Sequence, residues 1–348
     1  MPPLPVPPPP LLAEPLDLDI LREMYRDGTV NLAGIDPRLN ATRIAHRLRV
    51  GRTRVAGRLK AWNTSGFLLR YDVWLNPAIF GWQGAWMSIR VDHPRVKPAL
   101  FERLALIDGA VSGLEFLGDW ISLGVVAPDA SSIDRRADLV RGLAGVAEVE
   151  PPVLWKVPEP RRALSPLDVR IVRALRDRPR ATLSEIARRV GISTRTMTRR
   201  YSELVDDLAV WFVPVFDFRA ISYPVVSVGF FLAPEVEPEV VVRRIRSRYP
   251  LTLEFRSVRV GPDLAATEHV IFVMPPSAAH LEDLDHFVRS IDGVAAFETN
   301  VMVQVRSFPA WFDRHLETLS GGTRAAAVAP VPGRLKPSRP APRGPRTT

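Results

Sequence analysis

The chain has 348 residues, of which 46% are hydrophobic, and it carries a formal net charge of +9. This length favours two to four small domains, each with its own core. The complete absence of cysteine excludes disulfides, thiolate metal sites and cysteine nucleophiles. There is no run of 18 apolar residues and no secretory signal, so we expect a cytoplasmic protein that does not bind membranes.

Basic residues are concentrated in two internal blocks and in the C-terminal tail. Residues 38–60 carry eight Lys or Arg and no acid, and residues 161–203 carry twelve Arg and four acids. Residues 321–348 add six basic residues. Focused basic blocks on a nearly balanced chain are typical of proteins that bind the phosphate backbone. The expected partner is therefore double-stranded DNA.

In chain order, residues 1–13 are proline-rich and predict a disordered tail. Residues 14–76 predict a winged helix-turn-helix. Within it, residues 40–62 form two helices with a turn at Gly51, and two short strands then form a wing hairpin that turns at Gly66.

A domain of the order strand–helix–strand–strand–helix–strand is predicted at residues 77–158. This order is a ferredoxin-like βαββαβ unit. Gly109 and Gly145 each stand after a helix and before a valine-bearing strand, which is a common use of glycine as a C-cap.

The same order of domains then recurs, with a second winged helix-turn-helix at residues 162–218 and a second βαββαβ unit at residues 219–319. Residues 320–348 predict a disordered basic tail. In the second helix-turn-helix, Gly191 ends the first helix and Ser193 caps the next. The predicted fold class is α+β, a tandem of winged helix-turn-helix and ferredoxin-like domains.

The two helix-turn-helix segments align at a constant offset of 142 residues, which indicates an internal repeat. Ile44 matches Ile186, and Val55 matches Met197. The first copy is interpreted as the more degenerate, because its turn glycine is displaced and Gly57 lies inside a helix. In the second copy, residues 206 and 207 are aspartates where the wing glycine is expected.

The segment from Leu167 to Leu204, LDVRIVRALRDRPRATLSEIARRVGISTRTMTRRYSEL, resembles the Lrp/AsnC family of feast/famine transcription regulators. The resemblance implies a ligand-responsive βαββαβ (RAM) domain after each helix-turn-helix and an effector such as an amino acid. It also implies an intrachain pseudo-dimer of the two halves, with further homo-oligomers. The effector-site turn of that family matches Gly118 and Asp119 in part, and Gly261 and Asp263 more loosely.

The predicted DNA-binding residues are polar or basic positions on the outer faces of the two helix pairs. Arginine reads guanine, threonine can meet a thymine methyl group, and other basic residues contact phosphates. Arg58 and Arg200 are expected at the groove edge or bracing the helix. Phosphate contacts are expected from Arg43, Lys60, Arg188 and Arg189. The base-edge candidates are Arg52, Thr53 and Arg54 in the first copy and Thr194, Arg195, Thr196, Thr198 and Arg199 in the second. The full set also contains Arg58, Ser193 and Arg200.

The sequence predicts no catalytic or metal site and no cofactor, and the chain is expected not to be an enzyme. No glycine-rich phosphate loop or nucleophile elbow occurs. Sirohaem decarboxylases share the domain plan, but their histidine signature is absent from the corresponding strands. Three alternatives remain beside a sequence-specific regulator: a non-specific architectural DNA binder, a small-molecule sensor without DNA binding, and such a decarboxylase.

Overall fold

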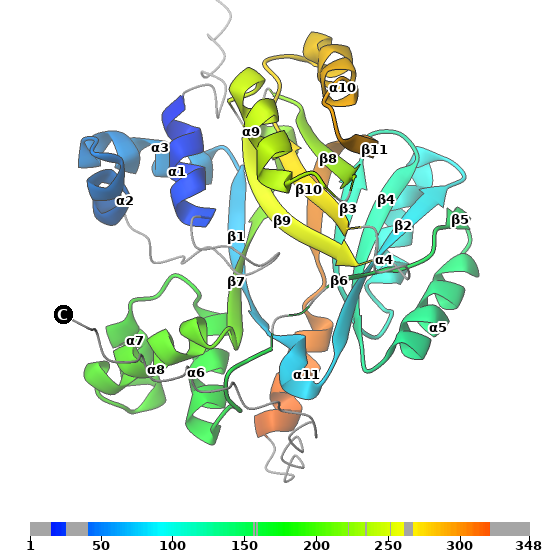
Figure 1. Cartoon of the computed structure of the whole chain (residues 1–348). Helices are drawn as coiled ribbons and strands as arrows, with labels where there is room; N and C mark the ends of the chain where they lie inside the picture. The colour runs from blue at the N-terminus through cyan, green and yellow to red at the C-terminus, as the bar shows by residue number, and fades with distance from the viewer. Residues whose placement is uncertain are drawn as a thin grey trace, which may run out of the picture.

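A computed structural model of the chain describes residues 15–25, 41–155, 157, 159–221, 223–233, 235–250, 252–260 and 267–320. Figure 1 shows two helical clusters on one side of a large curved β-structure. The predicted tails at residues 1–13 and 321–348 lie outside the described residues, as do Gly261 and Asp263. No helix within the described ranges is long and apolar enough to cross a membrane.

Each half of the chain begins with the three predicted helices, followed by one strand where a hairpin of two strands was predicted. The first half has α1 (Pro15–Tyr25), α2 (Ala41–Leu48), α3 (Arg52–Thr64) and β1 (Leu68–Leu75). The second has α6 (Pro166–Asp177), α7 (Leu183–Val190), α8 (Thr194–Asp206) and β7 (Val210–Phe216). We call these two units the first reader and the second reader.

The predicted wing hairpins do not form, because β1 and β7 pair with each other across the two halves. They make a two-stranded antiparallel ribbon in which Trp74 faces Trp211 and Leu75 faces Val210. Each reader thus supplies one strand of a shared ribbon in place of a two-stranded wing (Figure 1). A single strand is unstable alone, and the pairing satisfies the backbone groups of both.

The tight turns of the two readers have the same backbone geometry but different residues. The left-handed residue after α7 is Gly191, with φ 78°, and its counterpart after α2 is Arg49, with φ 56°. The prediction of Gly51 at this turn was wrong, since Gly51 precedes α3 in an extended conformation. After α3 and α8 the left-handed residues are Gly66 and Leu208. The aspartates before Leu208 therefore do not occupy the glycine position.

The left-handed Arg49 is a site where glycine should stabilise the first reader. A side chain at positive φ costs roughly 1 kcal/mol, part of which the greater flexibility of unfolded glycine offsets. We expect Arg49→Gly to raise the free energy of unfolding by about 0.5–1 kcal/mol. Ala56→Gly, inside α3, should lower it by about 1 kcal/mol. Denaturant titration of both variants measures the two signs, and a destabilised Arg49→Gly contradicts this account.

Behind each reader lies a βαββαβ unit. The first comprises η1 (Pro77–Phe80), β2 (Gln83–Val91), η2 (Pro94–Val96), α4 (Lys97–Leu104), β3 (Ala110–Phe116), β4 (Trp120–Ala127), α5 (Ala130–Arg141), β5 (Val146–Val149) and β6 (Val153–Trp155). The second comprises η3 (Phe218–Ala220), β8 (Val225–Leu232), α9 (Pro238–Arg248), β9 (Thr252–Val260), β10 (Thr267–Val273), η4 (Ala278–His280), α10 (Leu281–Arg289) and β11 (Val294–Ser307). The predicted strand at residues 146–157 is broken between β5 and β6 by a pair of prolines, which cannot donate to a ladder.

The two units join into one nine-stranded sheet of order β4-β3-β11-β8-β10-β9-β6-β2-β5. The sheet closes on itself because β4 also pairs with β2. The two halves meet at β3–β11 and at β6–β9, so each half covers an edge strand of the other. This structure, which we call the barrel, shows the predicted α+β class with ferredoxin-like units.

Four apolar clusters hold the parts together. Two lie between the barrel and its outer helices, α4 and α5 in one half and α9 and α10 in the other. The other two join each reader to the barrel. The C-terminal helix α11 (Ala310–Ser320) buries Trp311, Phe312 and Leu316 in the cluster of the second reader. Helix α11 therefore links the second reader, through α6, to the barrel.

Candidate nucleic-acid interface

Helix α8 has a buried apolar side and an exposed polar side. Met197, Tyr201 and Leu204 are buried against α6 and α7. The opposite side exposes Thr194, Arg195, Thr198 and Arg199, while Thr196 and Arg200 are half-buried.

Capping residues fix the start of each helix in this reader. Thr182 and Glu185 form a capping box at α7, and Ser193 accepts a hydrogen bond of 3.1 Å from the backbone N–H of Thr196 at α8. The side-chain hydrogen bond from Thr182 lowers the pKa of Glu185 and so keeps it ionised. The reading helix is thereby held at a defined angle to its support.

The predicted base-reading residues differ in how far they are already engaged. Arg195 has no hydrogen-bond or ion-pair partner among the described residues. Arg199 pairs with Glu203 at 3.1 Å, one turn along the helix. Thr198 donates to the carbonyl of Thr194 at 2.9 Å, which leaves its methyl group outward-facing on the exposed side. Arg195 is thus the arginine of this face whose five donors are uncommitted.

The supporting helix α7 presents two further arginines. Arg188 is exposed and has no polar partner in the described part of the chain. Arg189 forms an ion pair with Asp177 at the end of α6. A side chain already paired with a carboxylate has to exchange that partner for a phosphate, so Arg188 is the stronger candidate for a backbone contact.

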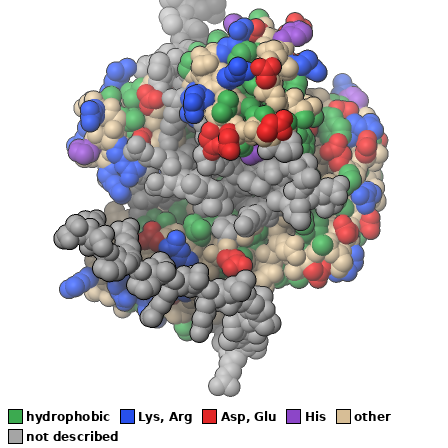
Figure 2. Space-filling view, viewed as in Figure 1, with side chains coloured by type: hydrophobic (Ala, Val, Ile, Leu, Met, Phe, Trp, Pro, Cys, Tyr) green, Lys and Arg blue, Asp and Glu red, His purple; other side chains and the backbone are tan. Residues whose placement is uncertain are grey.

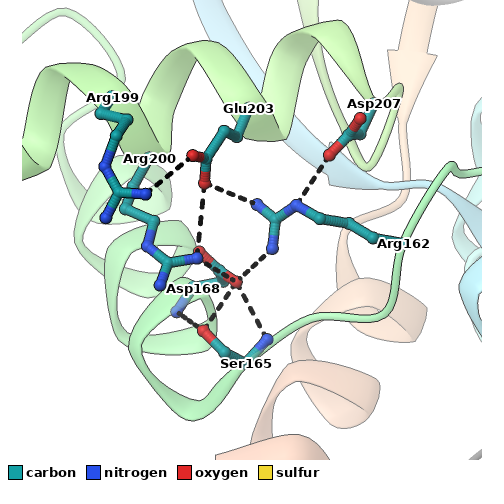
Figure 3. A network of polar contacts seen from close by, with 7 residues as sticks. All are labelled: Arg162, Ser165, Asp168, Arg199, Arg200, Glu203 and Asp207. Atoms are coloured by element: carbon teal, nitrogen blue, oxygen red, sulfur yellow. Dashed lines mark hydrogen bonds and ion pairs between the residues drawn. The ribbon is translucent and has the colours of Figure 1, made fainter.

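A network of charged residues behind α8 is centred on Asp168, whose side chain is 0% exposed (Figure 3). Arg162 donates to Asp168 at 2.7 Å, and Ser165 donates through its hydroxyl at 2.7 Å. Arg200 lies 3.8 Å from the same carboxylate and 3.4 Å from Glu203. The network joins α6 to α8 and turns the guanidinium of Arg200 toward the protein.

The Asp168 carboxylate stays ionised despite its burial. Burial alone raises the pKa of a carboxyl group, but hydrogen bonds from Arg162 and Ser165 outweigh it and lower the pKa of Asp168 below its ordinary value. The same hydrogen bond raises the pKa of Arg162. The network is therefore built on charged partners.

The first reader repeats this arrangement with different details. Asp17, also 0% exposed, accepts a hydrogen bond of 2.7 Å from Arg58 and one of 3.0 Å from the indole N–H of Trp62. Arg58 stands at the position equivalent to Arg200. Of the two roles expected for these arginines, bracing the helix is the one their contacts favour. The matching Leu-Asp pairs in α1 and α6 were the sequence signal for these carboxylates.

The exposed side of the first reader carries several basic residues. Arg43, Arg52, Thr53, Arg54 and Lys60 are all exposed. Two acids of α1 are buried, where Asp17 pairs with Arg58 and Glu23 with Arg47. In Figure 2, Lys and Arg side chains gather over α2 and α3, at the left of the view. The reader interpreted as degenerate thus also presents a basic surface.

The exposed basic residues of the first reader predict a strong salt dependence of DNA binding. Removing three phosphate contacts in Arg52→Ala/Arg54→Ala/Lys60→Ala should flatten the slope of log K against log salt by about 0.9 per contact. The loss should be similar for all DNA sequences, because phosphate contacts position without reading. Titrations at several salt concentrations measure the slope. The control Arg95→Ala/Arg103→Ala/Arg141→Ala removes equal charge from the barrel, and an equal change in it would contradict the assignment.

The two readers also touch each other directly. Arg180, in the turn between α6 and α7, donates to the side chain of Asn63 on α3 at 3.1 Å. Its guanidinium lies 5.7 Å from the ring centroid of Tyr71 on β1. Together with the β1–β7 ribbon, these contacts fix the second reader relative to the first.

The predicted effector residues Gly118 and Asp119 form the tight turn between β3 and β4. Gly118 has φ 84°, and the carbonyl of Asp119 accepts a hydrogen bond of 2.8 Å from Val91. The positive φ at this position accounts for the presence of a glycine without any role in ligand binding. No group of three or more potential metal ligands occurs among the residues that the structure describes.

Comparison with known proteins places the second reader. A family model described as winged helix-turn-helix DNA-binding matches residues 164–207. No curated protein matches the chain.

Among solved structures, a sirohaem decarboxylase, NirDL, in complex with an iron-uroporphyrin III analogue aligns over 87% of this chain and 98% of its own, with 13% identity and a TM-score of 0.48. AsnC of E. coli aligns over 44% of this chain and 98% of its own, with 13% identity and a TM-score of 0.29. A transcriptional regulator of Neisseria meningitidis in complex with L-Met aligns over 42% and 92%, with 18% identity and a TM-score of 0.30.

The prediction that the chain is not an enzyme was wrong. A structure that aligns over 87% of the chain is that of a decarboxylase, which is an enzyme. A match of 13% identity assigns no reaction to this chain. The exclusion of an enzyme, which rested on a missing histidine signature, is withdrawn.

Proposed function

We propose that the protein is a sequence-specific DNA-binding regulator of transcription, similar in plan to Lrp/AsnC regulators. The observation that carries the proposal is the second reader. Its capped helix α8 exposes Thr194, Arg195, Thr198 and Arg199 from a rigid support, and residues 164–207 match a winged helix-turn-helix DNA-binding model. A helix of this kind suits the major groove.

In this proposal the two readers do unequal work on one DNA. Arg195 and the threonines of α8 read base edges, while Arg43, Lys60 and Arg188 contact phosphates. Arg52 and Arg54, which were first expected at base edges, are assigned here to phosphates as well. Arg58 and Arg200 hold the reading helices in place through Asp17 and Asp168. Because the two reading faces differ in sequence, the bound site should be asymmetric instead of palindromic.

Selection of bound fragments from genomic DNA, followed by footprinting, tests the proposal. We expect a small set of fragments and a protected site whose two halves differ in sequence. A non-specific architectural binder would retain fragments without a shared sequence. A sensor that has lost DNA binding would retain none at physiological salt.

We further propose that one chain supplies both halves of the dimer on which such regulators depend. The pairings β1–β7, β3–β11 and β6–β9 are all within the chain, and they support this proposal. Light scattering coupled to size exclusion should give the mass of a single chain, 38.8 kDa, at low micromolar concentration. A constant mass of two chains on dilution would contradict self-sufficiency.

A further inference from the structure

A pocket of about 440 Å³ lies where the β1–β7 ribbon, α4 and the start of α11 meet the end of β11. This volume is within the range of small-molecule sites. The walls combine apolar side chains, Leu69, Phe101, Val215 and Phe308, with the charged side chains of Arg70, Glu102, Arg306 and Asp313. None of the predicted DNA-binding or effector residues lines it.

Three of the four charged side chains in this wall already have a partner. Arg70 pairs with Asp72 at 2.9 Å, Arg306 with Glu115 at 3.5 Å, and Asp313 with Arg176. Glu102 is exposed and has no polar partner among the described residues. The charge left without compensation in the pocket is therefore one carboxylate.

In the apolar part of the wall, Leu69 is exposed, whereas Phe101, Val215 and Phe308 are buried behind it. Leu69 is 47% exposed, which is unusual for a leucine on a ribbon that otherwise packs inward. The ring of Phe308 lies 6.4 Å from that of Phe101, whose face carries the guanidinium of Arg306 at 4.5 Å. Leu69 lies on β1, Val215 on β7, and Phe308 directly after β11, and all three line the pocket.

We propose that this pocket binds a small organic amine with an apolar body. The ammonium group pairs with the Glu102 carboxylate, and the apolar body covers Leu69, the exposed apolar side chain of the wall. A carboxylate ligand would meet the uncompensated charge of Glu102 and be repelled, and a purely apolar ligand would leave that carboxylate partly desolvated and unpaired.

The pocket also lies where a ligand could influence the readers, and this step rests on the proposed function. Its wall includes Leu69 and Val215 of the shared ribbon and Ala310 and Asp313 of α11. Helix α11 packs on the second reader, and Asp313 is tied to Arg176 of α6. An amine that changes the spacing of ribbon and α11 changes the position of α8, and hence the affinity for DNA.

Calorimetry on the full chain without DNA tests the site independently of the proposed function. The probes are 2-phenylethylamine, the neutral 2-phenylethanol and the anionic phenylacetate. We expect the amine to bind at least about tenfold more tightly than either, as a charge-assisted contact implies. Equal affinity of amine and alcohol, or no amine binding at millimolar concentration, would overturn the site.

Two variants locate the binding. Glu102→Gln should weaken amine binding about tenfold and leave the alcohol unchanged, and Leu69→Ala should weaken both. The control Glu150→Gln removes an exposed carboxylate elsewhere and should have no effect. Amine binding that is insensitive to Glu102→Gln would overturn the assignment to this pocket.

The same amine is then added to a gel-shift titration with DNA. A changed DNA affinity that is lost in Glu102→Gln supports regulation through this pocket, and an unchanged affinity overturns that step alone. If the chain binds no DNA at all, the proposed function fails, whereas calorimetry still decides whether the amine site exists.

Discussion

Replacing Asp168 with alanine is expected to lower the free energy of unfolding by about 3–5 kcal/mol, because it leaves Arg162 and Arg200 partly buried without their shared carboxylate. Asp168 is 0% exposed and receives hydrogen bonds from Arg162 and Ser165. Without it, Arg162 retains Asp207 and Arg200 retains Glu203, but the buried centre of the network loses its charge. The change should also weaken DNA binding, since Arg200 and α8 lose their anchor on α6.

Denaturant titration measures this loss, and Asp206→Ala is the matched control. Asp206 is an exposed acid at the end of α8, and its removal should cost less than about 0.5 kcal/mol. A loss below about 1 kcal/mol for Asp168→Ala would contradict the role of the network.

The pH dependence has a definite sign. The pKa of Asp168 is lower in the folded state than in the unfolded state, so its stabilisation is fully present above the unfolded value of about 4. It is lost as the pH falls through the folded value. The stability difference between the wild type and Asp168→Asn should therefore be constant near neutrality and narrow below about pH 4.

Replacing Arg195 with alanine is expected to cost about 1–3 kcal/mol of binding free energy at one base pair and to flatten the preference there. Arg195 is exposed on α8 and has no competing partner among the described residues. A bidentate contact from such a side chain to guanine discriminates between bases, whereas a phosphate contact does not.

Binding to a set of single-base variants of the selected site measures this preference. Arg188→Ala serves as the contrast, because it also removes one uncommitted arginine, but from the supporting helix. It should weaken binding by a similar factor on every sequence. If Arg195→Ala kept the wild-type preference at all positions, α8 would not be the reading helix.

The helices and most strands of this fold could be predicted from the sequence because their signals are local. The Ser193 cap, the Gly191 turn and the apolar spacing of α8 all lie within a few residues of one another. The wing could not be predicted in this way. The partner of β1 is β7, in the other half of the chain, and the periodicity of a strand does not name its partner.

The first reader shows where residue-type rules fail. Its turn has a left-handed residue at the position equivalent to Gly191, but this residue is Arg49. The turn was predicted at the nearby Gly51, because glycine is the residue type expected in a left-handed conformation. The buried partners Asp17 and Asp168 were also missed as a network, because Asp17 and Arg58 are far apart in sequence. The pocket beside Glu102 is assembled from four separated segments and left no pattern in the chain.

The central claim is that this chain reads DNA sequence, and the ratio of specific to non-specific affinity tests it most directly. The selected site and random DNA of equal length are titrated at one stated physiological salt concentration. We expect the specific affinity to exceed the non-specific affinity by a factor of at least about 10³. Arg195→Ala should lower this ratio. Arg52→Ala/Arg54→Ala/Lys60→Ala should lower both affinities and leave their ratio unchanged. A ratio near one for the wild type would contradict sequence-specific recognition.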